Sequence, residues 1–215
     1  LNPIKDLSPA NTLVIYTPAV KVGNAQLDFF QTNGFELLKR SQLLGLISNQ
    51  YITLAVAGTH GKTTTSCLLA HVLNQSTFNI NAFLGGISRD FDSNLVLNDN
   101  SEYFVTEADE YDRSFLHLHP TVGAITSIDS DHLDVYQTKE IFEEAFATFS
   151  SQVSQQLIVA YGLPFDGLTY GIEVDADYRI FNLNRLQGGY EFDLTTPTQK
   201  FSQVRLNQLG KHNLS

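Results

Sequence analysis

One stretch, YITLAVAGTHGKTTTSCLLA at residues 51–70, limits the folds open to this chain more than any other. It begins with an apolar run at 52–57 that is typical of a buried strand. A glycine-containing turn follows, then Lys62 and Thr63, and then apolar residues at helical spacing. A strand, a glycine turn, a Lys-Thr pair and a helix, in that order, form the layout of a phosphate-binding loop. The segment therefore predicts an α/β fold with a nucleoside triphosphate site at the end of this strand.

The turn and the first helical residues are the expected phosphate contacts: Gly58, Thr59, His60, Gly61, Lys62, Thr63 and Thr64. Glycine lets the backbone curl so that amide groups point inward, and the helix N-terminus adds partial positive charge. Lys62 can reach terminal phosphates, and the Thr63 hydroxyl is placed to ligate Mg²⁺. The spacing is G-x-x-G-K-T, with Val56 where the common pattern has its first glycine. A plain glycine turn with a surface lysine is the alternative, but it does not explain three threonines opening a helix.

Acidic groups and a histidine follow two further predicted strands. The strand at 103–106 runs into Glu107 and Glu110, and the strand at 122–128 runs into a segment that contains His132. A solvated acidic loop and a hydrogen-bonded structural histidine are the alternatives. Because open α/β sheets bind ligands at the carboxyl ends of their strands, we expect these side chains to lie beside the phosphate loop with a functional role, His132 as a metal ligand.

The remaining pattern predicts two domains. Residues 1–49, with a strand at 13–20 and helices at 24–33 and 36–48, are typical of the end of a Rossmann-like α/β domain. Residues 50–215 should form a parallel-sheet, P-loop ATPase-type domain, with helices at 62–74 and 139–150 and a strand at 81–88. Gly85-Gly86 would permit close approach of a ligand or simply form a turn. From 156 onward, short alternating segments predict an appended antiparallel β section.

Composition excludes several classes of function. A net charge of −10 argues against nucleic-acid binding, which depends on Lys and Arg patches. No apolar run approaches the length of a membrane span, and a single cysteine, Cys67, suits a reducing cytoplasm. Methionine is absent even at position 1, so we expect an excerpt of a longer chain.

Taken together, the motifs resemble the Mur ligase family of ATP-dependent, amide-forming enzymes of peptidoglycan precursor synthesis. The resemblance rests on AGTHGKTTTS (57–66), EADEYDRSFLHLHP (107–120), ITSIDSDHLDVY (125–136) and GKHN (210–213). It implies a three-domain fold, of which 1–49 would be the end of the UDP-binding N-terminal domain and 50–215 most of the central ATP-binding domain. The C-terminal domain would be absent from this sequence.

Within the family, the segments are most similar to members that join L-alanine to the lactyl carboxylate of UDP-N-acetylmuramate through an acyl phosphate. The resemblance implies Lys62, Glu107 and His132 as catalytic residues, with His212 and Asn213 near ATP. It implies metal ligation by Thr63, Glu107, Glu110 and His132, with Mg²⁺ as the ion, although Mn²⁺ would suit a histidine better. A cytoplasmic monomer or homodimer is expected.

Three alternatives stay open at this point. A related Mur-type ligase could recycle murein tripeptide or act as a folylpolyglutamate synthase, and substrate trials would separate these. A P-loop switch or motor NTPase would hydrolyse ATP or GTP without a carboxylate acceptor. A non-catalytic nucleotide-binding module would keep the loop without turnover.

Overall fold

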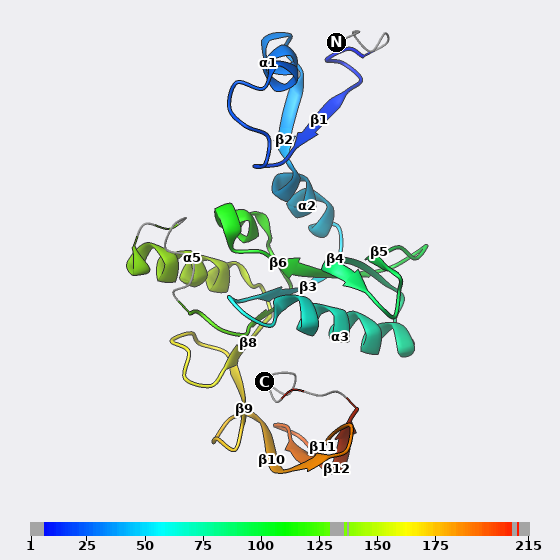
Figure 1. The fold of residues 1–215 in the computed structure, drawn as a ribbon, viewed down its shortest axis with the longest axis vertical. Helices are drawn as coiled ribbons and strands as arrows, with labels where there is room; N and C mark the ends of the chain where they lie inside the picture. Colours follow the sequence, from blue (N-terminus) through cyan, green and yellow to red (C-terminus); the bar gives the residue numbers. More distant parts are fainter. Residues whose placement is uncertain (1–6, 130–135, 137, 208–209, 211–215) are drawn as a thin grey trace.

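A ten-stranded sheet dominates the computed structural model, which describes residues 7–129, 136, 138–207 and 210. The strand order is β12-β11-β10-β9-β8-β7-β3-β6-β4-β5 (Figure 1). The five strands that come first in the sequence are β3 (Ile52–Ala57), β4 (Ile80–Ser88), β5 (Ser93–Val96), β6 (Tyr103–Ala108) and β7 (Val122–Ile125). The five that follow them in the sequence are β8 (Gln156–Ala160), β9 (Leu168–Ile172), β10 (Tyr178–Leu186), β11 (Gly189–Thr195) and β12 (Lys200–Leu206).

The centre of the sheet is parallel, as predicted. β3 lies between β6 and β7 and pairs with both in parallel, with Val56 opposite Glu107 on one side and Ala124 on the other. The carboxyl ends of these three strands therefore lie side by side. This register brings the phosphate loop after β3 next to the acidic segment that ends β6.

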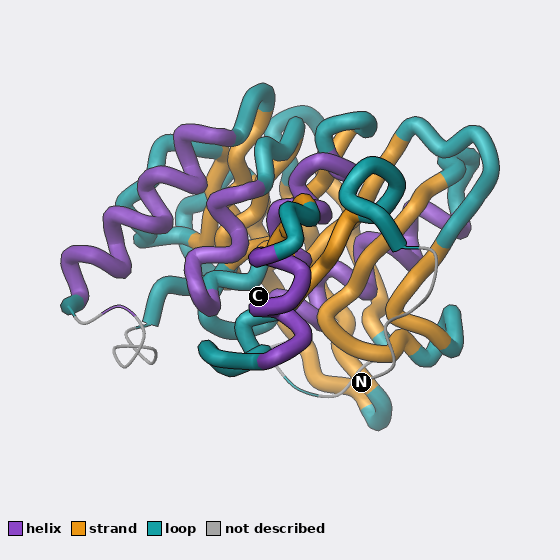
Figure 2. The backbone as a smooth tube through the Cα atoms, turned by 90° about the horizontal axis from the view of Figure 1, so that it is seen from above, coloured by secondary structure: helices purple, strands orange, loops and turns teal. Residues whose placement is uncertain are grey.

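Helices cover both faces of the parallel strands (Figure 2). α3 (Lys62–Gln75) packs with Ala70 and partly buried leucines against β4 and β6, while α5 (Lys139–Gln152) packs phenylalanines against β7 and β8. Successive residues of β3 belong to different clusters, Leu54 to the α3 side and Ala55 to the α5 side. Because side chains alternate along a strand, α3 and α5 lie on opposite faces.

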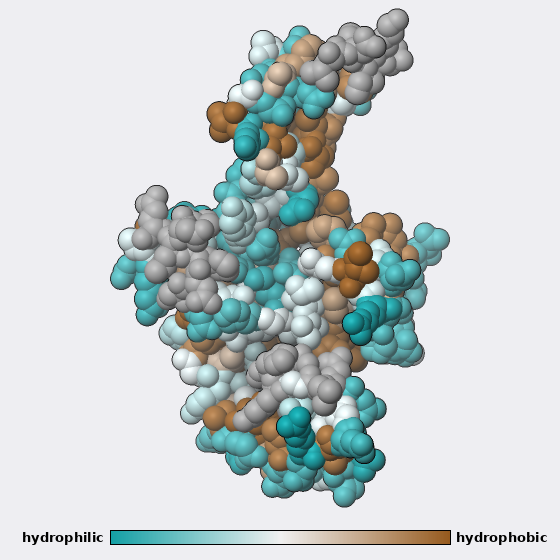
Figure 3. Space-filling view, viewed as in Figure 1, coloured by the Kyte–Doolittle hydropathy of each residue, from teal (hydrophilic) through white to brown (hydrophobic). Residues whose placement is uncertain are grey.

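The N-terminal residues form a separate unit. Its two strands, β1 (Leu13–Tyr16) and β2 (Glu36–Lys39), pair in parallel, with α1 (Ala25–Thr32) between them in sequence. Several of its apolar side chains are exposed, as the brown residues at the top of Figure 3 show, among them Leu13, Val22 and Phe29. The short helix α2 (Arg40–Ser48) then leads to β3.

The predicted helix at 36–48 is wrong in its first turn. Residues 36–39 form β2, and the helix begins only at Arg40. Leu37 and Leu38 pair with Val14 and Ile15 of β1, so pairing with a distant strand overrides local helix preference. The main-chain N–H of Lys39 donates to the Gln42 side chain at 2.8 Å, which fixes the helix start at this boundary.

The antiparallel section begins later than predicted. β8 pairs in parallel with β7, β9 with β8, and β10 with β9, so the parallel sheet extends through these strands. In this C-terminal section, β11 pairs antiparallel with β10 and with β12, and both ladders contain a register shift. At the other edge of the sheet, β5 pairs antiparallel with β4. Among the described residues, no helix is long and apolar enough to cross a membrane.

Strand ends near the predicted site also differ from expectation. β6 continues through Ala108, so Glu107 belongs to the strand, and the segment after it forms a 3₁₀ helix, η1 (Tyr111–His117). β7 stops at Ile125 rather than 128. Beyond this end, the Thr126 hydroxyl donates to the carbonyl of Ala57, the last residue of β3, and to that of His60 in the loop after β3.

Candidate functional site

The loop after β3 requires glycine at its first position. Gly58 has φ +135°, and a Cβ there would lie 2.1 Å from the Thr126 hydroxyl oxygen and 2.9 Å from the Ser127 amide nitrogen. Gly61, at φ +80°, caps the N-terminus of α3 in the left-handed region. Both glycines therefore meet a conformational demand that L side chains rarely satisfy.

Thr126 and Ser127, which directly follow β7, form a brace that holds this loop by hydrogen bonds. The Ser127 hydroxyl lies 2.8 Å from that of Thr59 and accepts from the His60 amide at 2.9 Å. The Ser127 carbonyl accepts from the Thr59 amide at 3.1 Å. The amides of Thr59 and His60 thus donate within the protein, while those of Lys62 and Thr63 lie in the first helical turn, where N–H groups lack helical partners.

Sequence reasoning missed Thr126 and Ser127 as members of the site. The available signal was their polarity directly after an apolar strand, at the same sheet edge as the phosphate loop. That predicted strand was instead read as continuing through residue 128. The predicted ATP contacts by Gly58, Thr59, His60, Gly61 and Thr64 stay predictions.

Lys62 lies against a buried carboxylate. Its Nζ is 2.6 Å from Oε2 of Glu110 and donates to the Gly58 carbonyl at 2.7 Å. The Lys62 side chain is 12 % exposed and that of Glu110 only 2 %. The two side chains therefore form a buried ion pair under the loop, which the sequence did not predict.

Thr63 and Glu107 are joined directly by a hydrogen bond, and their predicted role as metal ligands stays a prediction. The Thr63 hydroxyl donates to Oε2 of Glu107 at 2.7 Å. Gly85 of β4 makes room for this carboxylate, since a Cβ there would lie 2.0 Å from the same oxygen. The predicted close approach at Gly85 is thus made by a protein carboxylate.

These oxygens suit a hard cation such as Mg²⁺, which prefers oxygen ligands. A hydroxyl and a carboxylate beside the loop would occupy part of its coordination shell, and the ion would add charge neutralisation between phosphates. No group of three or more His, Cys, Asp or Glu side chains suited to a metal occurs in the described part of the chain. The predicted ligand His132 and the predicted ATP contacts His212 and Asn213 lie outside the described residues.

A cavity of about 190 Å³ opens beside Glu107. It lies between α2, β4, β6 and η1, and its lining includes Arg40, Asn94, Asp109 and Ser114. The site therefore offers a polar recess next to the Thr63–Glu107 pair.

Cys67 lies on α3, near the same glutamate. Its burial, and after that the Glu107 charge, raise the pKa of the Cys67 thiol, so this cysteine stays protonated at neutral pH.

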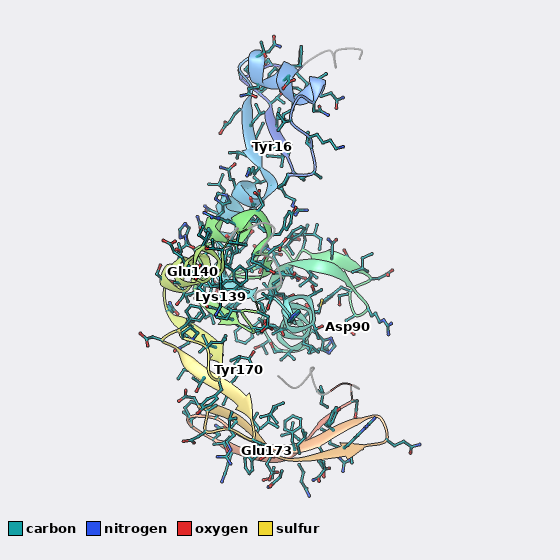
Figure 4. The ribbon with its side chains drawn as sticks, turned by 60° about the vertical axis from the view of Figure 1, so that its left-hand side comes forward. Tyr16, Asp90, Lys139, Glu140, Tyr170 and Glu173 are labelled. Carbon is teal, nitrogen blue, oxygen red and sulfur yellow. The ribbon has the colours of Figure 1, made fainter. Side chains whose placement is uncertain are left out.

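Asp90 follows the carboxyl end of β4, which lies at the same edge of the sheet as this site because β4 runs parallel to β6, and it is labelled in Figure 4. Its carboxylate lies 3.2 Å from Nδ1 of His71 on α3. The pair is partly exposed and ties the β4–β5 turn to the helix that carries Lys62.

Comparison with known proteins agrees with this geometry. The sequence model described as the Mur ligase middle domain matches residues 56–215. UDP-N-acetylmuramate–L-alanine ligase of Christiangramia forsetii is 45 % identical over 206 residues, covering 95 % of this chain and 45 % of the relative. The chain thus spans less than half the length of such curated relatives.

Solved structures share the fold. UDP-N-acetylmuramate-alanine ligase of Thermotoga maritima has a TM-score of 0.81 at 24 % identity, covering 96 % of this chain and 50 % of that one. The ligase from Neisseria meningitides that acts on UDP-N-acetylmuramate and L-alanyl-gamma-D-glutamyl-meso-diaminopimelate has a TM-score of 0.80 at 23 % identity, covering 93 % and 69 %. With most of its length matched by the family model, the chain belongs to the Mur ligase family.

Proposed function

We propose that this chain is part of an ATP-dependent ligase that joins L-alanine to the lactyl carboxylate of UDP-N-acetylmuramate. The observation that carries the proposal is the grouping of Lys62 with the Thr63–Glu107 pair beside a polar cavity. Two relatives that are 45 % and 43 % identical over 95 % of the chain are named for this activity.

Amide formation in water requires an activated carboxylate, and phosphoryl transfer from ATP supplies it as an acyl phosphate. Two anions must meet, so the work of the protein is charge neutralisation and alignment. Lys62 and the amides of the first turn of α3 would hold the terminal phosphates. The Thr63 hydroxyl and the Glu107 carboxylate would hold Mg²⁺ beside them, and the cavity next to Glu107 would receive the acceptor carboxylate.

The direct test measures phosphate release by the full-length protein from ATP and UDP-N-acetylmuramate with one amine substrate at a time. We expect release with L-alanine and little turnover without an acceptor. Preference for the murein tripeptide would replace the proposal with the recycling ligase, which shares this fold. Turnover of ATP or GTP independent of any carboxylate would support a switch NTPase instead.

Lys62→Ala tests the role of the loop. Loss of one preorganised donor to a transferring group lowers kcat by about 10²–10³-fold. Lys139→Ala is the matched control, because this exposed lysine of α5 pairs with its helical neighbour Glu143 at 3.2 Å, away from the loop. Near wild-type turnover in Lys62→Ala would remove the loop from the mechanism.

We also propose the domain assignment and cellular setting that this activity requires. Residues 1–49 would be the end of the UDP-binding domain and 50–215 the central ATP-binding domain. The exposed apolar side chains of the β1–β2 unit support a neighbouring domain surface there. The enzyme would work in the cytoplasm as a monomer or homodimer, which sedimentation of the full-length protein would decide.

A further inference from the structure

The pair formed by Lys62 and Glu110 differs from an ordinary surface ion pair. Its 2.6 Å separation lies under the loop, with both side chains largely withdrawn from solvent. Burying a charge is costly unless an opposite charge and hydrogen bonds compensate it. Stability alone does not explain a buried ion pair at this place, because two apolar side chains would fill the same space with a smaller desolvation penalty.

Two oxygens hold the ammonium group of Lys62 in place. An ammonium has three N–H donors, and the Gly58 carbonyl accepts one of them at 2.7 Å. Oε2 of Glu110 lies 2.6 Å from the same nitrogen as its charged partner. The position of Glu110 therefore helps to set where the remaining donors of Lys62 point.

Glu110 is itself firmly held. Its main-chain carbonyl accepts from the hydroxyl of Tyr136 and from the Arg113 amide. Tyr136 is fully buried in the cluster beneath α5, where its ring packs on Phe142 with centroids 4.9 Å apart. The backbone of Glu110 is therefore tied to the hydrophobic core, and its side chain is 2 % exposed.

The neighbouring carboxylate has another partner. Glu107 accepts from the Thr63 hydroxyl, whereas Glu110 lies against Lys62. The two glutamates of one short segment are thus directed to two different residues of the loop helix. Glu107 and Thr63 would then hold the metal ion together, while Glu110 holds Lys62.

We propose that Glu110 is a positioning residue that orients the Lys62 ammonium toward the transferring phosphoryl group. The proposal rests on the proposed function for its catalytic readout. It assigns Glu110 a different part from the metal-ligand role expected of it from sequence. Glu110 acts through Lys62, so its removal has an effect only where Lys62 is present.

Glu110→Gln in the full-length protein tests this, because glutamine keeps the shape and removes the charge. We expect kcat to fall about 10-fold to 10²-fold, less than for loss of Lys62 itself, with KM for ATP changed less than about threefold. The Mg²⁺ concentration for half-maximal activity should stay at the wild-type value. Glu143→Gln, which breaks the exposed Lys139–Glu143 pair of 3.2 Å, is the matched control and should leave kcat unchanged.

The decisive measurement combines the two substitutions. In a Lys62→Ala background, adding Glu110→Gln should lower residual activity less than about twofold, since residues acting as a unit are strongly non-additive. An equal loss in both backgrounds, or a raised Mg²⁺ requirement, would overturn the proposal in favour of metal ligation. Should Glu110→Gln fail to fold, Glu110→Asp withdraws the carboxylate by one methylene. It should then lower kcat at an unchanged Mg²⁺ requirement.

A binding assay keeps this test separate from the ligase proposal. Fluorescent ATP analogue binding to the full-length protein needs no acceptor. Glu110→Gln should weaken it about fivefold when Lys62 is present and less than about twofold in Lys62→Ala. If wild type shows no alanine-dependent turnover but this coupling is found, the substrate assignment fails and the positioning role stands. Without the coupling, the positioning role fails by itself.

Discussion

The centre of the sheet and its C-terminal strands are built in opposite ways. Around β3, β6 and β7, helices cover both faces, and residues such as Ala57, Val105 and Ile125 are fully buried. In β10–β12 the buried apolar side chains of the described residues are Tyr190 and Phe192. Polar side chains of these strands form contacts at the surface; for example, Nε of Arg205 lies 2.8 Å from Oε2 of Glu191.

The difference shows what the proposed phosphoryl-transfer site would require of its scaffold. Every described residue proposed for chemistry lies at the carboxyl ends of strands in the doubly covered centre. There, neighbouring strands fix one another, so loop atoms are held within hydrogen-bond distance. The C-terminal strands extend the same sheet with less burial, and their ladders shift register. Each prediction below compares the two regions or tests one of them alone.

Phe146→Ala should have the largest effect. Phe146 is fully buried and contacts the rings of Phe115 and Phe142 at centroid distances of 5.1 and 5.0 Å. Truncation leaves a cavity and should lower the free energy of unfolding by about 3–5 kcal/mol. Urea unfolding of the full-length protein, followed by tyrosine fluorescence, measures it.

Phe201→Ala in β12 is the matched substitution. Phe201 is 43 % exposed, so about 1 kcal/mol or less should be lost. Equal costs at the two positions would contradict the contrast in burial between the regions.

Gly58→Ala should come next. A Cβ at φ +135° would be strained, and it would collide with the Thr126 hydroxyl at 2.1 Å. We expect a loss of about 2–3 kcal/mol, together with loss of ATP binding. Gly162→Ala, after β8, shares a positive φ of +92° but meets nothing within 4 Å, so about 1 kcal/mol should be lost. Thermal denaturation of both variants decides whether the Thr126–Ser127 brace, and not φ alone, fixes the loop.

Gly85→Ala should disturb the proposed metal site without unfolding the protein. The new methyl would lie 2.0 Å from the Glu107 carboxylate, which can swing away from Thr63. The Mg²⁺ concentration for half-maximal activity should rise about tenfold. Gly86→Ala is the control, because its nearest neighbour is the Thr63 methyl at an ordinary 3.5 Å. Identical Mg²⁺ titrations for the two variants would remove the Thr63–Glu107 pair from metal binding.

The smallest effect concerns acid stability in the outer region. Hydrogen bonds from the Thr169 amide and hydroxyl, at 2.8 and 2.7 Å, lower the pKa of Asp177 from its ordinary value of 3.8. A lowered folded-state pKa adds stability above the unfolded value, and this is lost as pH falls through the folded one. Asp177→Asn should therefore flatten the loss of stability below about pH 4.

Thr169→Val removes only the hydroxyl donor and should flatten the same acid profile in part. Urea midpoints measured from pH 5 to pH 2 would record both variants. A profile unchanged in Asp177→Asn would contradict the assignment of these hydrogen bonds to the carboxylate.

Tyr170 gives the alkaline counterpart. It lies on β9, where the sheet passes from the centre to the outer strands (Figure 4), and burial raises its pKa to about 12. Its contribution is complete below the ordinary value of 10.0 and is lost as pH rises toward the folded value. Tyr170→Phe should remove this dependence.

The features that could be predicted from the sequence depend on residues that are close together in the chain. The strand, glycine turn and helix around Lys62 were predictable because their periodicities and turn residues are local. Glu107 was predictable as a site residue because it directly follows an apolar run. Helix ends such as Thr138, whose side chain accepts from the Ile141 amide, also follow local rules.

What could not be predicted depends on distant pairing. Thr59 and Ser127 are 68 residues apart, and nothing in either segment specifies their contact. The direction of β8 and β9 was missed because alternation marks a strand without marking its neighbour's orientation. Residues 36–39 were misassigned because a Leu-Leu pair suits helix and strand alike. Pairing with β1 decides between them.

The order of the sheet has one further consequence, for behaviour at high protein concentration. Its two outermost strands, β5 and β12, present unpaired backbone groups that could recruit a strand from another copy. β5 has only four residues, and β12 carries Lys200 and Arg205, a left-handed Gln203 and an irregular ladder. Short length, positive charge and local twist each oppose edge-to-edge growth. A sheet this wide can thus end at both sides without becoming a seed for aggregation.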